Sequence, residues 1–267
     1  MKKDLIKLLA IGLVLFLSGF TLRSIGIAES AAEAATDQAI EVSYQMNDGF
    51  LLYAWLYDAD PANEKPGLAL LLPMMGHTHD SYENFISLLK TNGYAALAFD
   101  LRGHGKSVKA GSRTFAYEDM TPDEFALIPE DINSFFGNFK KENPRRFDYD
   151  NIVVIGASIG ANTAGLLLDE NWLTRAVLLS PGKDYRSLEP GLVMAVSDVS
   201  GQSGKAVYIA ASKEDQYSAS SSQWLFDQYP GPKIYKKYPG NNHGTDILDN
   251  VKDADRELIE WLAAQEE

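Results

Sequence analysis

Ser158 stands in a sequence context that can activate a hydroxyl group for nucleophilic chemistry. It is the central residue of a G-x-S-x-G pattern at positions 156–160, directly after the apolar residues 152–155. A sharp strand-to-helix turn of this kind holds a serine in a strained conformation, and the two glycines avoid collisions with neighbouring backbone. The pattern predicts a serine nucleophile at the end of a buried strand. The alternative is a tight turn with a serine at the start of a helix.

A serine nucleophile needs a base, and the chain has four histidines, at positions 77, 79, 104 and 243. His243 lies in a Gly/Asn-rich loop between an expected last strand and an expected last helix. Histidine changes protonation near neutral pH, so it can take a proton and return it. We therefore predict that His243 is the general base, the alternative being a histidine on a surface loop.

An acidic residue must orient that imidazole ring. Asp215 follows the apolar residues 206–210 and is our first choice, with its neighbour Glu214 and the more distant Asp184 as alternatives. The order Ser158, Asp215, His243 is the Ser…Asp/Glu…His chain order of α/β-hydrolases, and it differs from the orders of the chymotrypsin and subtilisin triads.

The elements that would position these residues alternate between short apolar runs and longer amphipathic ones. Continuous apolar runs are typical of parallel strands buried on both faces, and they occupy residues 68–72, 94–99, 152–155, 176–179 and 206–210, with a further strand expected at 233–238. Helices are expected at residues 81–91, 123–141, 158–170, 188–197, 219–228 and 245–264. Ahead of them, residues 40–46 and 50–57 flank an Asn-Asp-Gly turn and predict an antiparallel hairpin.

This alternation predicts an α/β fold with a mostly parallel central sheet, an N-terminal antiparallel hairpin and helices on both faces. Residues 36–267 contain no internal repeat or linker-like stretch, so one domain is expected. Ligands of such sheets bind beyond the carboxyl ends of the strands. The three candidate residues all follow expected strands.

With these motifs the chain resembles the α/β-hydrolase superfamily, in particular the small-capped serine esterases and the dienelactone-hydrolase-like group. The resemblance extends over residues 40–262 and includes the D-x-R-G-H-G-x-S loop at 100–107, Ser180-Pro-Gly and Asn242-His243-Gly244. Dienelactone hydrolases use a cysteine where this chain has Ser158, so their specific reaction is not implied. In such enzymes the 100–107 loop is a family marker, which implies a structural role for His104.

The resemblance also implies an oxyanion hole made of two backbone N–H groups, those of Ile159 and, by alignment of the preceding strand end, Met75. Many relatives carry His-Gly near this second position, where this chain has Pro-Met-Met. No long lid insertion follows residues 176–179. A shallow cleft rimmed by Met74, Tyr117, Tyr185 and Tyr217 would suit short or medium acyl groups.

The segment His77-Thr-His79-Asp80 could bind a divalent cation, but no other histidine cluster or cysteine completes a site. A polar loop near the cleft is the preferred interpretation. We expect no metal and no cofactor.

The N-terminal 35 residues read as a secretory signal peptide. Lysines at positions 2, 3 and 7 precede an uncharged run at residues 8–22, and small residues around Ala32-Glu-Ala34 follow. The uncharged run is shorter than the roughly 20 residues needed to span a bilayer. We expect an exported protein, periplasmic, extracellular or on the cell surface, with an uncleaved anchor as the alternative.

Composition excludes several function classes. The chain of 267 residues has no cysteine, which removes disulfides, thiolate metal sites and a cysteine nucleophile. Its formal charge of −13, without any Lys/Arg-dense stretch, argues against a nucleic-acid partner. The expected activity is hydrolysis of a small-molecule carboxylic ester. A peptidase, an acyltransferase or a catalytically silent binding protein of the same fold are the alternatives.

Overall fold

The computed structural model describes residues 39–196 and 204–264. The chain divides into two units, Met1–Gln38 and Ala39–Glu267, and the described residues all belong to the second. The expected signal peptide at residues 1–35 therefore lies outside the described residues. Within the described ranges, no helix combines the length and the apolar character that crossing a membrane requires.

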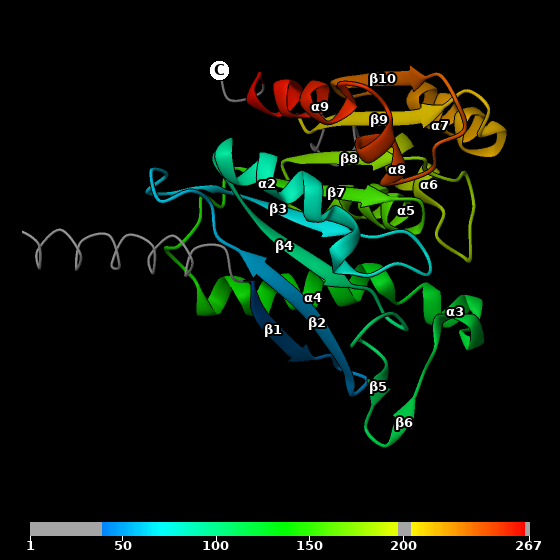
Figure 1. Cartoon of the computed structure of the whole chain (residues 1–267). Helices are drawn as coiled ribbons and strands as arrows, with labels where there is room; N and C mark the ends of the chain where they lie inside the picture. The colour runs from blue at the N-terminus through cyan, green and yellow to red at the C-terminus, as the bar shows by residue number, and fades with distance from the viewer. Residues whose placement is uncertain (1–38, 197–203, 265–267) are drawn as a thin grey trace, which may run out of the picture. The chain divides into compact units, whose positions relative to one another are not determined.

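In the described part, one sheet has the strand order β10-β9-β8-β7-β3-β4-β2-β5-β6, with β1 paired to β2 (Figure 1). From β10 to β4 all neighbours are parallel, and β2 joins β4 antiparallel. The strands are β1 Ile40–Gln45, β2 Phe50–Tyr57, β3 Gly67–Leu72, β4 Tyr94–Asp100, β5 Lys109–Ala110, β6 Arg113–Thr114, β7 Ile152–Ala157, β8 Arg175–Leu179, β9 Ala206–Ser212 and β10 Lys233–Tyr238. The mostly parallel sheet with an antiparallel edge confirms the predicted fold class.

The hairpin of β1 and β2 follows from the Asn-Asp-Gly turn. Gly49 has φ +84°, a left-handed conformation that glycine adopts without steric cost. The Asp48 carboxylate accepts the Phe50 N–H at 3.0 Å, and the Met46 N–H donates to the Phe50 carbonyl at 2.7 Å. These bonds close the turn and set the register that pairs Ile40 with Leu56.

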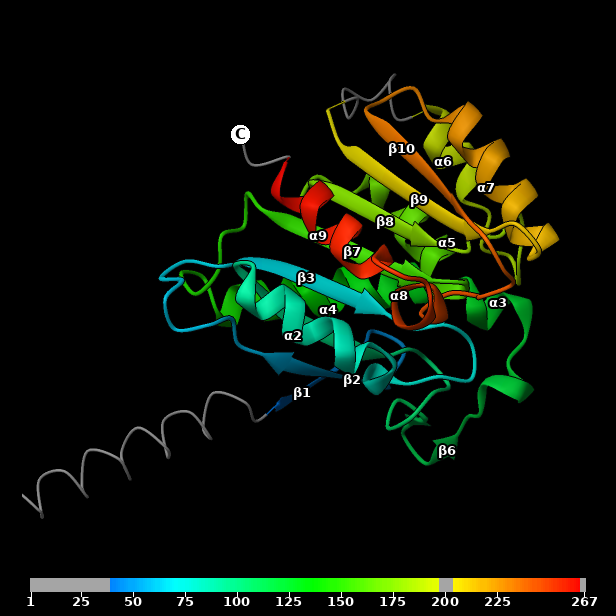
Figure 2. The same cartoon turned by 45° about the horizontal axis from the view of Figure 1, so that its top comes forward.

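Alternate residues of the parallel strands face two separate cores. Leu70 and Val154 belong to the core under helices α4 to α7, whereas Leu71 and Ile155 belong to the core under α2, α8 and α9. Figure 2 shows α2, α8 and α9 in front of the sheet and α4 and α5 behind it. Because both faces are covered, the central strands are apolar throughout and fully buried.

The helices are α2 Glu83–Thr91, α3 Pro122–Phe125, α4 Ile128–Glu142, α5 Ile159–Leu166, α6 Pro190–Val196, α7 Gln216–Gln228, α8 Asp246–Asn250 and α9 Ala254–Ala263, with 3-10 turns η1 His79–Tyr82, η2 Tyr117–Asp119 and η3 Leu167–Asp169. The last residue of the helix expected at 188–197 lies outside the described residues.

Two expected helices are each broken in two, which corrects the prediction. In the segment 123–141, the capping box of Thr121 and Glu124 starts the short α3, which ends at Phe125. A separate helix, α4, begins at Ile128 with a proline in its first turn. The segment 245–264 splits at Asp253, which has φ +63° and so cannot continue a right-handed helix.

The loops at the carboxyl ends of β3, β7, β8, β9 and β10 lie on one edge of the sheet (Figure 1). Residues 108–129 contain the β5–β6 hairpin, η2, α3 and the first residues of α4. Met120 and Phe125 from this stretch are buried in the same core as residues of α4, the helix that follows.

Candidate active site

Ser158 sits at the turn between strand β7 and helix α5 in a strained conformation. Its backbone has φ +52° and ψ −112°, which non-glycine residues rarely adopt. The Ser158 N–H donates to the Leu179 carbonyl at 2.8 Å, and its own carbonyl accepts the Asn162 N–H at 3.0 Å. The surrounding strand and helix thus hold the strained residue in place.

The two flanking glycines permit this turn because the backbone approaches itself closely on both sides. A Cβ atom at Gly156 would lie 2.0 Å from the Gly160 carbonyl oxygen, and one at Gly160 would lie 2.2 Å from the Leu72 carbonyl oxygen. No side chain fits at such distances, so only glycine is compatible with the turn. The spacing predicted from sequence therefore has a direct steric cause.

His243 lies in the loop between β10 and α8, and its ring contacts Asp215 after β9. The His243 Nδ1 atom lies 2.6 Å from Asp215 Oδ2, and the two side chains are 40% and 16% exposed. Asp215 is also the N-cap of α7, where its other oxygen accepts the Ser218 N–H at 3.3 Å. The positive end of the helix dipole favours a charged carboxylate there.

The alternatives considered for the acid lie elsewhere. Glu214 is exposed, and its backbone N–H donates to the Gly240 carbonyl at 3.0 Å. Asp184 is exposed and accepts the hydroxyl of Tyr217 on its backbone carbonyl. Among these three acids the His243 ring is paired with Asp215.

Ser180 joins the loop that contains His243 to the central sheet through two hydrogen bonds. Its hydroxyl is buried and accepts the Gly244 N–H at 3.0 Å, while its own N–H donates to the Ala210 carbonyl at 2.7 Å. Ser180 has φ +53°, a second strained serine at the end of a neighbouring strand. It fixes the residue directly after His243.

Ser158 and His243 open onto one pocket of about 170 Å³. Its other lining residues come from α5, from the loop after β8 and from the start of α7, and they are Asn162, Ser180, Gly182, Tyr185, Tyr217 and Ser218. Two of the four residues proposed from sequence for the cleft, Tyr185 and Tyr217, lie in this lining. The pocket therefore joins four loops that are far apart in the sequence.

Met74 and Tyr117, the other two residues proposed for the cleft, are placed differently. Met74 is 7% exposed and packs against Gly244, where its sulfur would lie 2.8 Å from an added Cβ. Tyr117 stacks on His104, with ring centroids 4.6 Å apart. Neither belongs to the lining of the pocket as the described residues define it.

The two backbone groups proposed for the oxyanion hole are both unengaged. Within residues 39–196 and 204–264, neither the Ile159 N–H nor the Met75 N–H donates a hydrogen bond to the protein. Ile159 is the first residue of α5, directly after Ser158, and Met75 lies in the loop after β3. A helix start leaves such donors available for a developing negative charge.

Asn162 and Ser218 are site residues that sequence reasoning missed. Asn162 is buried, donates to the Leu188 carbonyl and accepts the Gly182 N–H, both at 2.8 Å, so it shapes the pocket floor. The Ser218 hydroxyl lies 3.5 Å from His243 Nδ1. Their residue types alone gave no signal. The one clue in the sequence is their spacing: Asn162 follows Ser158 by four positions and Ser218 follows Asp215 by three, which is one helical turn.

His77 and His79 lie outside the lining of the pocket, as the described residues define it. His79 stacks on Trp55 at 3.5 Å between centroids, and its Nδ1 lies 2.9 Å from Asp100. His77 is exposed. In the described ranges no group of three or more His, Asp or Glu residues could hold a metal ion.

The arrangement can perform acyl transfer. It combines a serine at a helix start, an imidazole on the same pocket, a carboxylate on that imidazole and the unengaged N–H of Ile159 directly after the serine. Burial raises the pKa of Tyr217 above its ordinary value, so its phenol stays protonated and donates to the Asp184 carbonyl at 2.7 Å.

A model of the family described as "serine aminopeptidase, S33" matches residues 64–262, which is most of the chain. The chain belongs to this family of α/β-hydrolases. It is therefore a serine hydrolase, and the resemblance inferred from its motifs is confirmed.

Solved structures of esterases share the fold of this serine hydrolase. A thermostable carboxyl esterase from Bacillus coagulans, in complex with glycerol, has a TM-score of 0.62 at 16% identity and covers 86% of this chain and 98% of its own. Est1E from Butyrivibrio proteoclasticus, with bound ferulic acid, has a TM-score of 0.62 at 20% identity over 84% and 100% of the two chains. An esterase from Exiguobacterium antarcticum gives 0.60 at 14% identity over 84% and 100%. A search of curated proteins found no match.

Proposed function

We propose that this serine hydrolase is exported and cleaves carboxylic esters of small or medium acyl groups through a Ser158-His243-Asp215 triad. The observation that carries the proposal is the 2.6 Å contact between His243 Nδ1 and Asp215 Oδ2, on an imidazole that lines one pocket with Ser158. With Nδ1 donating to the carboxylate, Nε2 is the nitrogen left to accept a proton.

In the proposed reaction Ser158 Oγ attacks the ester carbonyl while His243 Nε2 takes the hydroxyl proton. The negative charge that forms on the carbonyl oxygen is bound by the N–H groups of Ile159 and Met75. The bond from the carbonyl carbon to the leaving alcohol then breaks, and the imidazolium returns its proton to that alcohol. Water repeats the sequence on the acyl-enzyme and releases the acid. Asp215 holds the ring and stabilises its charged form.

The size of the pocket supports small or medium acyl groups. Its volume of about 170 Å³ is below the roughly 300 Å³ at which pockets for drug-sized ligands begin. Tyr185 and Tyr217 give it apolar walls. We expect kcat/KM for 4-nitrophenyl esters to be highest for short acyl chains and to fall as the chain lengthens.

Peptide hydrolysis is the second candidate, because the matched family is described as a serine aminopeptidase. An aminopeptidase has to bind the ammonium group of its substrate, for which a carboxylate in the pocket is the usual partner. No Asp or Glu belongs to the pocket lining as the described residues define it. This favours esters over peptides with a free amino terminus.

The test is a comparison of 4-nitrophenyl esters with aminoacyl 4-nitroanilides on the wild type and on Ser158→Ala. Ester turnover that Ser158→Ala abolishes, with little anilide turnover, supports the proposal. A higher kcat/KM for the anilides would assign a peptidase. A folded wild type that is inert toward both would favour the silent binding protein.

Export is tested separately, on protein recovered from expressing bacterial cells. We expect cell fractionation to find the chain outside the cytoplasm. Its intact mass should show the loss of about the first 35 residues, as expected for a cleaved signal peptide. An intact chain in the membrane fraction would instead assign the uncleaved anchor.

A further inference from the structure

A second depression of about 750 Å³ lies beside the proposed catalytic pocket. It runs between one face of α7 and the carboxyl ends of β9 and β10, and its lining residues are Lys213, Gln216, Tyr217, Ala219, Ser220, Gln223 and Lys237. Four of these residues recur at helical spacing from position 216 to position 223, so the depression extends about 10 Å along the helix. We call it the lysine groove.

The lysine groove adjoins the catalytic pocket through Tyr217, which lines both. The Tyr217 hydroxyl donates to the Asp184 carbonyl at 2.7 Å and would lie 3.0 Å from a Cβ at Gly182. The ring is thus held between the two depressions. A molecule bound at Ser158 that extends beyond Tyr217 enters the lysine groove.

The charge of the lysine groove is opposite to that of the whole chain. The chain carries a net charge of −13, yet this lining has two lysines and no carboxylate. Acids lie at its margin. Glu214 and Asp215 follow Lys213 in the sequence, and Asp227 accepts a hydrogen bond from Gln223 at 3.1 Å. Asp184 accepts the Tyr217 hydroxyl. The groove is therefore a local cationic site with acids only at its margin.

Both lysines are available for a ligand, unlike the two other lysines of strand β10. Lys236 pairs with Glu257 at 2.9 Å, and Lys233 donates to two carbonyls at the end of α7. Lys213 and Lys237 are exposed, and their ammonium groups have no hydrogen bond or ion pair within the described ranges. An unpaired ammonium beside a pocket favours a negatively charged partner.

We infer that the substrate of this enzyme is an ester with a carboxylate or another oxyanion, and that Lys213 and Lys237 bind this group while the ester bond lies at Ser158. The inference rests on the proposed function and adds the class of substrate to it. The amide of Gln216 supplies a further donor at the start of the groove.

The test compares pairs of esters in which an anionic carboxylate is replaced by a neutral group of similar size. On the acyl side, 4-nitrophenyl hydrogen glutarate is compared with 4-nitrophenyl pentanoate. On the alcohol side, the butyrate ester of 4-hydroxybenzoic acid is compared with that of its methyl ester. The readout is the ratio of kcat/KM for the anionic ester to that for the neutral one, which cancels general effects on catalysis.

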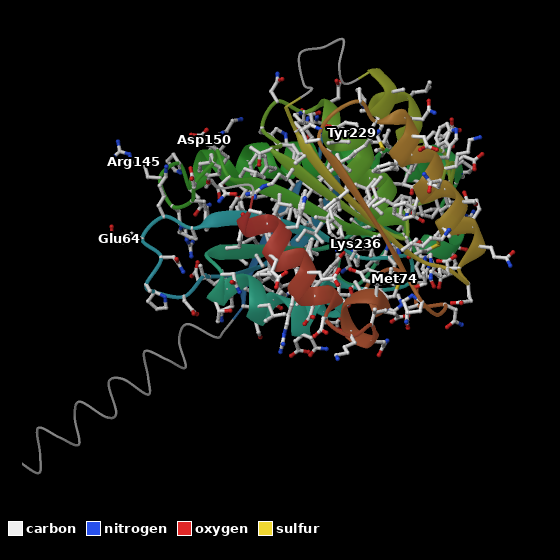
Figure 3. All side chains as sticks on the ribbon, turned by 90° about the horizontal axis from the view of Figure 1, so that it is seen from above. Glu64, Met74, Arg145, Asp150, Tyr229 and Lys236 are labelled. Carbon is white, nitrogen blue, oxygen red and sulfur yellow. The ribbon has the colours of Figure 1, made fainter. Side chains whose placement is uncertain are left out.

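In Lys213→Glu/Lys237→Glu we expect this ratio to fall at least about tenfold for one of the two pairs, because two exposed attractions become repulsions. Lys213→Arg/Lys237→Arg keeps the charges and should keep the ratio. The matched control is Lys65→Glu/Lys141→Glu, which changes net charge equally at the far end of the sheet. Figure 3 labels Glu64 and Arg145 there, opposite Met74. High salt should lower the wild-type ratio.

The outcomes separate the two proposals. If the wild type hydrolyses the neutral esters and the double reversal leaves both ratios unchanged, the lysine groove binds no anion and only this inference is overturned. If the control variant lowers the ratio as much as the double reversal, the effect is one of net charge, and the inference is likewise overturned. If the folded wild type hydrolyses none of the esters, the proposed function itself fails.

Discussion

Two regions at the same edge of the sheet each carry a serine, a histidine and an aspartate. Ser158, Asp215 and His243 come from three loops, whereas the loop after β4 carries Asp100, His104 and Ser107. Their exposure differs sharply. The His243 side chain is 40% exposed on a pocket, and His104 is 2% exposed in the interior.

The second set is occupied with holding the fold together. The Asp100 carboxylate accepts the N–H groups of His79 and Lys106 at 3.0 and 2.7 Å, and the Ser107 hydroxyl accepts the Tyr53 N–H at 2.9 Å. His104 Nδ1 lies 3.0 Å from the Arg102 carbonyl. His104 Nε2 has no hydrogen-bond partner within the described ranges, but the ring is buried and no substrate reaches it. Internal partners and burial therefore make these residue types structural in one loop, whereas the same types are available in the other.

Replacing His243 and His104 should give the largest difference between the two regions, with a loss of activity in one variant and a loss of stability in the other. We expect His243→Ala to lower kcat by at least about a thousandfold with little change in Tm, because it removes the base and leaves the core intact. We expect His104→Ala to lower the free energy of unfolding by about 2 to 4 kcal/mol, because it deletes a buried ring stacked on Tyr117. Steady-state kinetics and thermal unfolding of both variants measure this. Equal losses of activity in the two folded proteins would break the comparison.

The acids next to His243 give the second contrast. Asp215→Asn should lower kcat by about a hundredfold to ten-thousandfold, because an amide cannot hold the imidazole in the required tautomer. Glu214→Gln, its sequence neighbour, should stay within about threefold of the wild type. Comparable losses in both would return Glu214 to consideration as the orienting acid.

Ser180 tests whether the position of the histidine loop matters. In Ser180→Ala the buried Gly244 N–H loses its acceptor, which costs about 1 to 3 kcal/mol of stability. Because Gly244 is then no longer held by this hydrogen bond, His243 is less well positioned. We therefore expect kcat to fall about tenfold while KM changes little. Ser180→Thr, which keeps the hydroxyl, should recover part of kcat. A loss of stability without any loss of kcat would limit Ser180 to a structural role.

The smallest expected effect is a pH dependence of stability. Burial lowers the pKa of His104 below its ordinary value of 6.5. Below about pH 6.5 the unfolded chain then binds more protons at this residue than the folded chain, so its contribution to stability falls as the pH falls. Thermal unfolding between pH 5 and 8 should show a weaker slope in His104→Gln than in the wild type. An identical slope in both proteins would contradict a lowered pKa.

The sequence predicts the buried strands and the strand-to-helix turn at Ser158 well because both depend on local patterns. Continuous apolar runs mark strands covered on both faces, and the glycines at positions 156 and 160 mark a turn where a Cβ would collide with backbone. The start of α3 is also readable from the sequence, since Thr121 and Glu124 form a capping box signal.

The pocket walls could not be predicted in the same way. Asn162, Ser180 and Ser218 meet because three neighbouring strands end at one edge, and no periodicity within a single segment records that meeting. For the same reason Met74 and Tyr117 were grouped with Tyr185 and Tyr217 by their place in loops, although the fold turns Met74 toward Gly244 and Tyr117 toward His104.

The most direct measurement is peptide mass spectrometry after incubation of the wild type and of His243→Ala with a fluorophosphonate, which phosphonylates activated serines. We expect one equivalent of adduct on Ser158 in the wild type and almost none in His243→Ala, because only the wild type has a base to take the serine proton. A folded wild type without an adduct on Ser158, or equal labelling in both proteins, would contradict an activated Ser158-His243-Asp215 triad.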